Sequence, residues 1–193
     1  MRLGRDFYAR SVHDVARDLV GCVVRHGVTA GRIVETESYH MDEPACHAYV
    51  GLTERTRTLF GAPGHAYVYF SYGIHSLLNA VAEPEDTGAA VLIRALEPVE
   101  GVEVMRMRRG VQGATELCSG PAKLTQALEI GLSLNGSSLL DGPIEVLERE
   151  ARPHIAVGER IGITKAVDLP WRFCDADSAH VSRPWPAAMR SAA

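Results

Sequence analysis

The chain has 193 residues, of which 46% are hydrophobic and 23% are charged, a composition typical of one globular domain spanning residues 1–193. No run approaches the roughly 18 apolar residues of a membrane span, and the first residues lack the apolar core of a secretory signal. The sequence therefore predicts a soluble intracellular, cytoplasmic protein without membrane partners. The net charge of −4 argues against strong nonspecific binding to nucleic acid.

Positive charge and thiols are unevenly distributed. The basic residues are 18 arginines and two lysines, and Arg106, Arg108 and Arg109 gather where a helix is expected to end. Cations there complement the helix dipole, so a solvated surface and a DNA-binding patch both remain open. The four cysteines are scattered without C-x-x-C spacing, which predicts free thiols.

The first half of the chain predicts a helix, a hairpin and a long loop. Residues 11–20 form an amphipathic run that Ser11 can cap and Gly21 ends. Residues 22–24 and 32–37 predict two antiparallel strands, with Glu37 at a strand end. Residues 40–65 lack any period, which predicts a long functional loop.

The rest of the chain continues with strands and helices. Residues 66–72 and 74–82 predict a second hairpin, and residues 90–96 a buried strand whose single arginine, Arg94, needs a partner. Helices are expected from Pro98 onward and over 122–130. Strands are expected near 144–147 and 160–164, and an irregular tail after Pro170.

Two glutamates stand out on the second predicted strand. Alternation places Ile33, Glu35, Glu37 and Tyr39 on one face. Like charges so close raise at least one pKa, which prepares a general acid or base. Spacing alone also fits an edge strand kept soluble by acidic residues.

The second hairpin is rich in aromatic residues in a chain that is only 6% aromatic. Tyr67 and Tyr69 share a face and Tyr72 lies at the turn beside Gly73. Aromatic side chains at a hairpin tip can wedge between base steps, and those beside a pocket can sandwich an extruded base. They can also fill a core, a reading favoured for Tyr67.

Seven segments, in order and with close spacing, together strongly resemble the alkyladenine (3-methyladenine) DNA glycosylase family. The resemblance covers nearly the whole chain. It is carried by the run 31–39 (GRIVETESY), His47, the run 67–69 (YVY) with Tyr72-Gly73, Asn79, the run 92–98 (LIRALEP), the run 117–124 (LCSGPAKL) and the run 170–173 (PWRF).

The resemblance implies a role for each matched residue. Glu37 matches the catalytic acid that deprotonates a water set against C1′ of a flipped nucleotide. Arg94 matches the arginine that holds this water and the nearby phosphate. The remaining matches are Tyr39, His47 and Tyr69, which stack on and hydrogen-bond the extruded purine, Asn79, which clashes with the 2-amino group of guanine, and Tyr72, which intercalates through the minor groove.

The resemblance also implies an α+β fold: one domain with a curved, mostly antiparallel, barrel-like sheet surrounded by helices and carrying a protruding hairpin. The implied substrate is double-stranded DNA containing alkylated purines such as 3-methyladenine and 7-methylguanine. Cationic purines leave readily, whereas neutral hypoxanthine needs an added proton. The chemistry needs no cofactor and no metal, and a monomer suffices for it.

The chain departs from the family pattern at two places. A loop that often reads Thr-Pro-Arg-Asn is here residues 53–56 (TERT), and residues 74–75 read Ile-His where a methionine and an aromatic residue are common. A basic N-terminal extension found in several relatives is missing. With the negative net charge, these departures predict weaker and more salt-sensitive DNA binding.

Other functions fit the sequence less well. A zinc deaminase requires H-x-E and P-C-x-x-C motifs, which residues 44–47 do not supply. A sugar glycosidase would use paired carboxylates, but both tryptophans lie in the tail, and a glycosylase-lyase would need Lys123 or Lys165 as nucleophile.

Two further readings stay open. A noncatalytic nucleic-acid binding module would keep the aromatic hairpin without needing Glu37 and Arg94. The turn 119–121 (SGP), at a helix start, fits either phosphate binding through its amides or an ordinary helix start.

Overall fold

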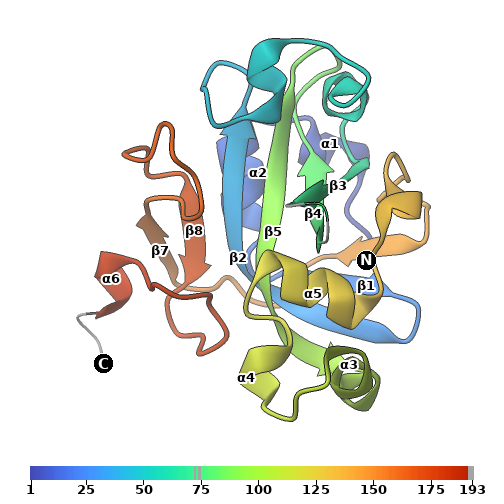
Figure 1. The fold of residues 1–193 in the computed structure, drawn as a ribbon, viewed down its shortest axis with the longest axis vertical. Coiled ribbons are helices and arrows are strands. Elements are labelled where there is room, and N and C mark those ends of the chain that lie inside the picture. Colours follow the sequence, from blue (N-terminus) through green and yellow to red (C-terminus); the bar gives the residue numbers. More distant parts are fainter. Residues whose placement is uncertain (72, 74, 191–193) are drawn as a thin grey trace.

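The protein is described from a computed structural model that covers residues 1–71, 73 and 75–190 (Figure 1). In this part of the chain, eight strands form one sheet in the order β3-β4-β5-β2-β1-β6, with β8 added beside β2 and β7 beside β8. Every pairing is antiparallel. The strands are β1 (Val23–His26), β2 (Thr29–His40), β3 (Ala66–Ser71), β4 (His75–Val81), β5 (Ala89–Glu100), β6 (Ile144–Leu147), β7 (Ile155–Gly158) and β8 (Arg172–Asp175).

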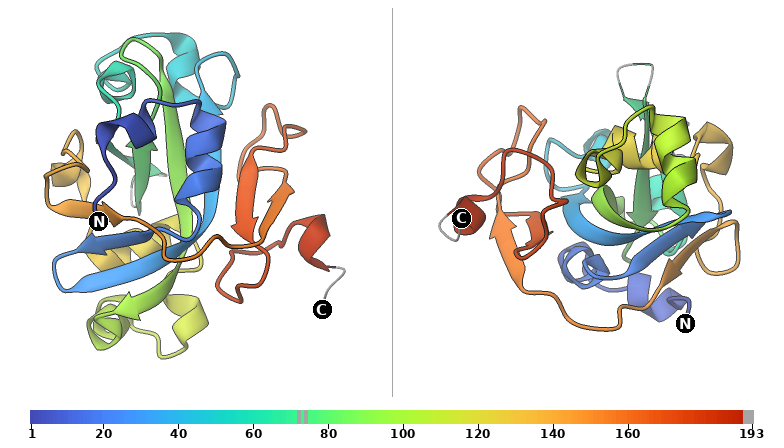
Figure 2. Two further views of the ribbon diagram at one scale, coloured as in Figure 1. Left: turned by 180° about the vertical axis from the view of Figure 1, so that it is seen from behind. Right: turned by 90° about the horizontal axis from the view of Figure 1, so that it is seen from below.

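Helices surround this curved sheet, as Figures 1 and 2 show. Helix α2 lies against β2, and α5 against β4 and β5. The helices are α1 (Arg5–Tyr8), α2 (Val12–Leu19), α3 (Val102–Arg109), α4 (Ala114–Leu117), α5 (Pro121–Leu128) and α6 (Ala187–Arg190), with 3₁₀ turns η1 (His47–Val50), η2 (Arg57–Phe60) and η3 (Leu132–Leu134). The arrangement confirms the predicted α+β fold with its curved antiparallel sheet.

The two long strands β2 and β5 form the middle of the molecule (Figure 1). One edge of β2 pairs with β5. Along its other edge, β1 pairs with residues 29–32 and β8 pairs with residues 35–37. The acidic segment of β2 is therefore covered on both edges. The soluble-edge interpretation of Glu35 and Glu37 is wrong.

The hydrophobic core forms between the sheet and its helices. Helix α2 contributes Val12, Val15, Ala16 and Leu19 to it, which is the face that the amphipathic pattern predicts. Helix α5 ends at Leu128, because Glu129 takes the left-handed backbone conformation that terminates helices. All four cysteines are buried and unpaired, which confirms the predicted free thiols.

Both predicted hairpins are present. Strands β1 and β2 pair through a tight turn after His26, and β3 pairs with β4 from Ala66↔Ala80 to Ser71↔His75. The adjoining ends of β3 and β4 extend away from the rest of the sheet in the right-hand view of Figure 2. The predicted loop over 40–65 is present as well, tightened by η1 and η2.

Several expected boundaries are wrong. The sequence predicts a helix that begins at Pro98. Pro98 instead pairs with Gly31 inside β5, next to a register shift that tolerates its missing N–H group. The helix α3 starts only after Gly101, whose backbone is left-handed at φ 67°. Glu37 lies within β2 rather than at its end, because the strand continues to His40.

The C-terminal region also differs from the expectation. Residues 160–164 alternate like a strand but lie in a loop, since the strand of this region is β7, and it pairs with β8. The expected irregular tail contains β8 and the short helix α6. Strand β8 forms because residues 172–174 add to the free edge of β2, a partner that local sequence cannot reveal. No helix in the described residues is long and apolar enough to cross a membrane.

Candidate active site

Glu37 is completely buried on β2, and its carboxylate accepts three hydrogen bonds. One carboxylate oxygen accepts the backbone N–H of Ile161 at 2.8 Å. The other accepts the hydroxyl of Tyr39 at 2.8 Å and the guanidinium of Arg94 at 3.2 Å. These three residues line a cavity, so the carboxylate lies directly behind the cavity wall.

The pKa of Glu37 is raised above its ordinary value of 4.5. Burial is the main cause, and the neighbouring Glu35 adds a smaller contribution. Arg94, the Ile161 amide and the Tyr39 hydroxyl act in the opposite direction because they stabilise the carboxylate. The sequence predicts a raised pKa from like-charge repulsion, and the pKa of Glu37 is raised, but desolvation is the larger physical cause.

Glu35 is also completely buried, yet its surroundings are different. Its oxygens accept bonds from Arg94 at 2.9 Å and Arg172 at 2.8 Å, and from the hydroxyl and backbone N–H of Ser182 at 2.8 and 2.7 Å. Four donors saturate this carboxylate. It does not line the cavity.

Arg94 finds the partner that its place in an apolar strand requires. It bridges Glu35 and Glu37, and these carboxylates raise its pKa against the opposing effect of burial. The bridge depends on irregular pairing between β2 and β5, whose register shifts on both sides of Glu35. A β-bulge of this kind re-aims side chains, and Arg94 falls at the second shift.

The same irregularity changes which residues share a face. Glu35, Glu37 and Tyr39 all lie on the side of Arg94, as alternation predicts. Ile33 instead packs in the main hydrophobic core, and Val34 packs against the C-terminal elements. The register shift between Ile33 and Glu35 separates Ile33 from the face that Glu35, Glu37 and Tyr39 share.

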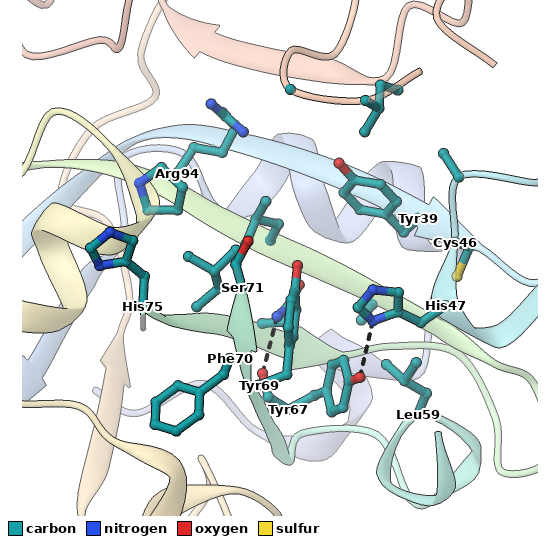
Figure 3. A pocket seen from close by; sticks show the side chains of 18 of the residues that line it. Tyr39, Cys46, His47, Leu59, Tyr67, Tyr69, Phe70, Ser71, His75 and Arg94 are labelled. Atoms are coloured by element: carbon teal, nitrogen blue, oxygen red, sulfur yellow. Dashed lines mark hydrogen bonds between the residues drawn. The ribbon is translucent and has the colours of Figure 1, made fainter. Parts of the chain in front are cut away.

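The cavity beside Arg94 has a volume of about 650 Å³ and an aromatic wall (Figure 3). Its wall includes Tyr39 from β2, His47 from η1, and Tyr67 and Tyr69 from β3. The His47 and Tyr69 rings meet edge to face, with centroids 4.6 Å apart, and Tyr67 and Tyr69 lie 5.3 Å apart. The structure therefore brings the three predicted base-stacking residues to one space.

His47 is held by a hydrogen bond of 3.1 Å between its Nδ1 and the Tyr67 hydroxyl (Figure 3). Burial, followed by the nearby Arg55, lowers the pKa of His47 below 6.5. Its imidazole is therefore neutral at pH 7. Burial raises the pKa of Tyr69 to about 12, so this phenol keeps its proton.

Asn79 lies on β4 across from Tyr67 and also lines the cavity. Its amide nitrogen donates to the backbone carbonyl of Tyr67 at 3.0 Å, and its side chain is 5% exposed. This bond fixes the orientation of the amide. Tyr67 is itself buried against Cys46 and Leu59, which confirms its predicted packing role while its hydroxyl holds His47.

The matches to known proteins agree with this geometry. The model of the methylpurine-DNA glycosylase (MPG) family matches residues 6–179. Relatives in Rhodopseudomonas palustris (strain ATCC BAA-98 / CGA009), Methanoculleus marisnigri and Carboxydothermus hydrogenoformans bear the name "Putative 3-methyladenine DNA glycosylase". They are 52%, 50% and 50% identical to this chain, over 95% of it in each case and over 89%, 100% and 100% of their own lengths.

The chain belongs to the methylpurine-DNA glycosylase family. This confirms the resemblance found in the sequence and the enzyme class that follows from it, a DNA glycosylase of base excision repair with a DNA substrate.

Two positions of the family pattern are not described by the structure. Tyr72, the predicted intercalating residue, and Ile74, one of the departures from the family pattern, lie outside the described residues. Ser71 and His75, on either side, both line the cavity. The described ends of the hairpin therefore stand at the cavity rim.

The other departure from the family pattern is local. Glu54 forms an exposed ion pair of 2.6 Å with Arg57. Arg55 instead lines the cavity, where its guanidinium lies 3.4 Å from Nε2 of His47. The acidic residue that replaces the usual proline is thus compensated without drawing Arg55 away.

The arginine cluster at the end of α3 has partners within the protein. Arg106 pairs with Glu103, Arg108 pairs with Glu129, and Arg109 donates to the carbonyl of Leu117 at 3.1 Å. These side chains do not line the cavity. These contacts tie the cluster at the end of α3 to its neighbouring elements.

Sequence reasoning missed four residues of the site. Arg172 holds Glu35, the Ile161 amide holds Glu37, and Arg160 pairs with Glu43 at 2.6 Å. The signal for Arg172 was present, since it lies in the run 170–173 that resembles the family. Nothing in the local pattern marks Arg160, whose partner is 117 residues away.

No group of three histidine, cysteine or acidic side chains comes together as metal ligands among the described residues. The turn 119–121 leads into α5, whose first residues Pro121 and Ala122 line the cavity. Its Ser119 hydroxyl lies 3.4 Å from the ammonium of Lys123.

Proposed function

We propose that this chain excises alkylated purines, including 3-methyladenine and 7-methylguanine, from double-stranded DNA, and that neutral hypoxanthine is a slower substrate. The damaged nucleotide flips into the aromatic cavity, and water hydrolyses its N-glycosidic bond to leave an abasic site. The single observation that carries this proposal is the place of Glu37, a buried carboxylate behind the wall of an aromatic cavity and bonded to Arg94.

Glu37 acts as the general base and Arg94 orients the water. The water oxygen forms a bond to C1′ while the bond from C1′ to the purine nitrogen breaks, and the water proton passes to the Glu37 carboxylate. The purine leaves with the bonding electron pair, which neutralises the ring of a cationic lesion. The carboxylate also stabilises positive charge that develops on the sugar.

The aromatic wall receives the base. Tyr39 on one side and the edge-to-face pair of His47 and Tyr69 on the other provide stacking surfaces and polar tips. The neutral imidazole of His47 suits a cationic purine because it places no positive charge against the positively charged ring. Asn79 excludes guanine by steric conflict with its 2-amino group.

The charge of the cavity fits a DNA substrate in spite of the acidic chain. The charged side chains that line it are Arg55, Arg94 and Lys165, and no carboxylate lines it among the described residues. Positive charge at a cavity mouth attracts phosphate. We infer that residues 1–193 act as one domain and as a monomer without a cofactor. We also infer, from the family resemblance, that Tyr72 intercalates into the DNA.

The proposed enzyme is monofunctional. A lyase needs an amine nucleophile. The lysine that lines the cavity among the described residues is Lys165, and it is exposed to solvent. Glu37 and Arg94 instead form a buried pair that suits an activated water. Borohydride reduction during turnover of a hypoxanthine duplex should therefore trap no covalent protein–DNA adduct, and a trapped adduct lost in Lys165→Ala would contradict the proposal.

The deciding experiment measures release of free base from methylated genomic DNA and from a duplex with one hypoxanthine. The native protein is compared with Glu37→Gln, which keeps the shape of the side chain. Release of methylated purines by the native protein alone supports the proposal, and the hypoxanthine result sets the substrate range. Duplex binding without release of any base by either protein would instead favour the noncatalytic binding module.

A further inference from the structure

Arg160 forms a completely buried ion pair at the edge of the cavity. Its side chain is 0% exposed and that of Glu43 is 6% exposed. The two guanidinium nitrogens meet the two carboxylate oxygens at 2.6 and 3.0 Å, which is the bidentate arrangement that arginine favours. Neither residue lines the cavity.

The same guanidinium ties three separate segments together. It donates to the backbone carbonyl of Ser38 on β2 at 3.1 Å and to that of Ala166 at 3.2 Å. The second bond closes residues 160–166 into a loop. Residues 161–165 of this loop all line the cavity, so Arg160 anchors one of its walls.

Arg160 also contacts the stacking residue of the site. Its guanidinium carbon lies 4.6 Å from the ring centroid of Tyr39 and 5.1 Å from that of Trp171. Planar contact with aromatic rings is typical of arginine and is not available to lysine in the same form. The Tyr39 ring is therefore fixed by Arg160 at its ring and by Glu37 at its hydroxyl.

The residue after Arg160 completes the connection. Ile161 donates its backbone N–H to Glu37 at 2.8 Å. Two of the three donors of the Glu37 carboxylate, the Tyr39 hydroxyl and the Ile161 amide, are thus placed by groups that Arg160 holds. The Nε–H of Arg160 is buried without a hydrogen-bond partner in the described structure.

We propose that Arg160, held in place by Glu43, is a positioning residue that sets the hydrogen bonds of Glu37 and the stacking face of Tyr39. The inference rests on the proposed role of Glu37 as general base. Arg160 touches neither the flipped base nor the water, and acts through Tyr39 and the loop 160–166.

The charged and titratable groups around Glu37 show how this role can be measured. They come from four elements: Glu35 and Tyr39 on β2, Arg94 on β5, Cys174 on β8 and Tyr69 on β3. Substitution of Arg160 replaces none of these residues, and of these groups Arg160 contacts Tyr39, through its ring. Loss of the Ile161 bond removes a donor that stabilises the carboxylate, so the pKa of Glu37 should rise.

The test compares Arg160→Met with native protein in single-turnover release of methylated purines across pH. We expect kcat to fall about 30-fold, since small displacements of catalytic groups cost one to two orders of magnitude. The acid limb of the profile should move to higher pH by about one unit. The Kd for a lesion duplex should change less than about threefold, because Arg160 is buried and does not line the cavity.

Two milder variants keep the test valid where Arg160→Met folds poorly. Arg160→Lys retains the charge beside Glu43 but not the fork or the planar contact with Tyr39, so both effects should be smaller and in the same direction. Glu43→Gln removes the carboxylate that orients Arg160 and should act likewise. Arg149→Met is the matched control, since Arg149 pairs with Asp18 through a partly buried guanidinium that does not line the cavity.

The outcomes separate positioning from stability. The proposal is supported if both Arg160→Met and Arg149→Met lower the thermal midpoint of unfolding, but only Arg160→Met moves the acid limb of the pH–rate profile. An unchanged rate and acid limb in folded Arg160→Met overturns it. Titration of the Glu37 carboxyl by ¹³C NMR, assigned with Glu37→Gln, decides the question even if the native protein releases no base, so the two proposals fail independently.

Discussion

Glu35 and Glu37 stand two residues apart on β2, are both completely buried, and both bind Arg94. Their surroundings nevertheless differ. Glu35 accepts four bonds from Arg94, Arg172 and Ser182 and lies away from the cavity. Glu37 accepts three bonds, and each of its donors belongs to a residue of the cavity wall.

The difference shows how one strand supports two roles with the same side chain. A carboxylate saturated by two guanidinium groups holds the structure together, since removal of any partner leaves a buried charge uncompensated. A carboxylate with fewer donors, raised in pKa by burial and next to a cavity, is suited to proton transfer. Environment rather than residue type separates Glu35 from Glu37, the proposed general base.

The largest effect should come from Glu37→Gln. We expect the rate of base release to fall by about three orders of magnitude, which lies within the range for loss of a general base. The free energy of unfolding at pH 7 should be equal or higher, because a carboxyl whose pKa is raised by burial opposes folding when ionised. Base release measures the rate, and urea unfolding measures the stability. An inactive Glu37→Gln variant that is also strongly destabilised would contradict the distinction between Glu37 and Glu35.

Glu35→Gln should reverse this pattern. Arg172 would lose the one carboxylate that it pairs with among the described residues, so the free energy of unfolding should fall by about 3 kcal/mol, as for other broken buried ion pairs. The rate per folded molecule should fall less than in Glu37→Gln. Urea unfolding with fluorescence detection tests the first statement and single-turnover release tests the second; native-like stability would show that Glu35 is not the structural partner.

The pH profile of the native protein should report the Glu37 carboxylate. Since burial raises its pKa, the acid limb of kcat should lie above 4.5, with the rate falling about tenfold for each pH unit below the midpoint. Circular dichroism at each pH excludes unfolding as the cause. The residual rate of Glu37→Gln should lack this limb, and the same limb in that variant would assign the titration to another group.

The smallest effect should come from Asn79→Ala, a change at the cavity wall that leaves both glutamates untouched. Release of unmodified guanine should rise by a few-fold, because a steric conflict with its 2-amino group is removed and small pocket changes alter selectivity by about 1–3 kcal/mol. Release of 3-methyladenine should stay near the native rate. Base analysis by chromatography measures both, and unchanged guanine release would remove Asn79 from the selectivity filter.

Local sequence was enough for much of this protein. Alternation and turn residues predicted the two hairpins, the helix α2 and the buried strand of Arg94, because these features depend on neighbours close in the chain. A lone arginine in an apolar run also predicted a buried partner, and Arg94 has two. The family resemblance, now confirmed by the family match, brought together Tyr39, His47 and Tyr69 before any geometry was known.

Tertiary structure alone decided the rest. The bulged register between β2 and β5, the pairing of β8 with β2, and the loop 160–166 join segments more than fifty residues apart, so no local period encodes them. These contacts give Glu35 four donors and Glu37 three. The sequence determined that two carboxylates and a tyrosine would share one face and that Arg94 would need a partner. The long-range packing of Arg172, Ser182 and Ile161 decided that Glu35 has four donors and Glu37 three, because hydrogen-bond supply and desolvation depend on the surrounding elements.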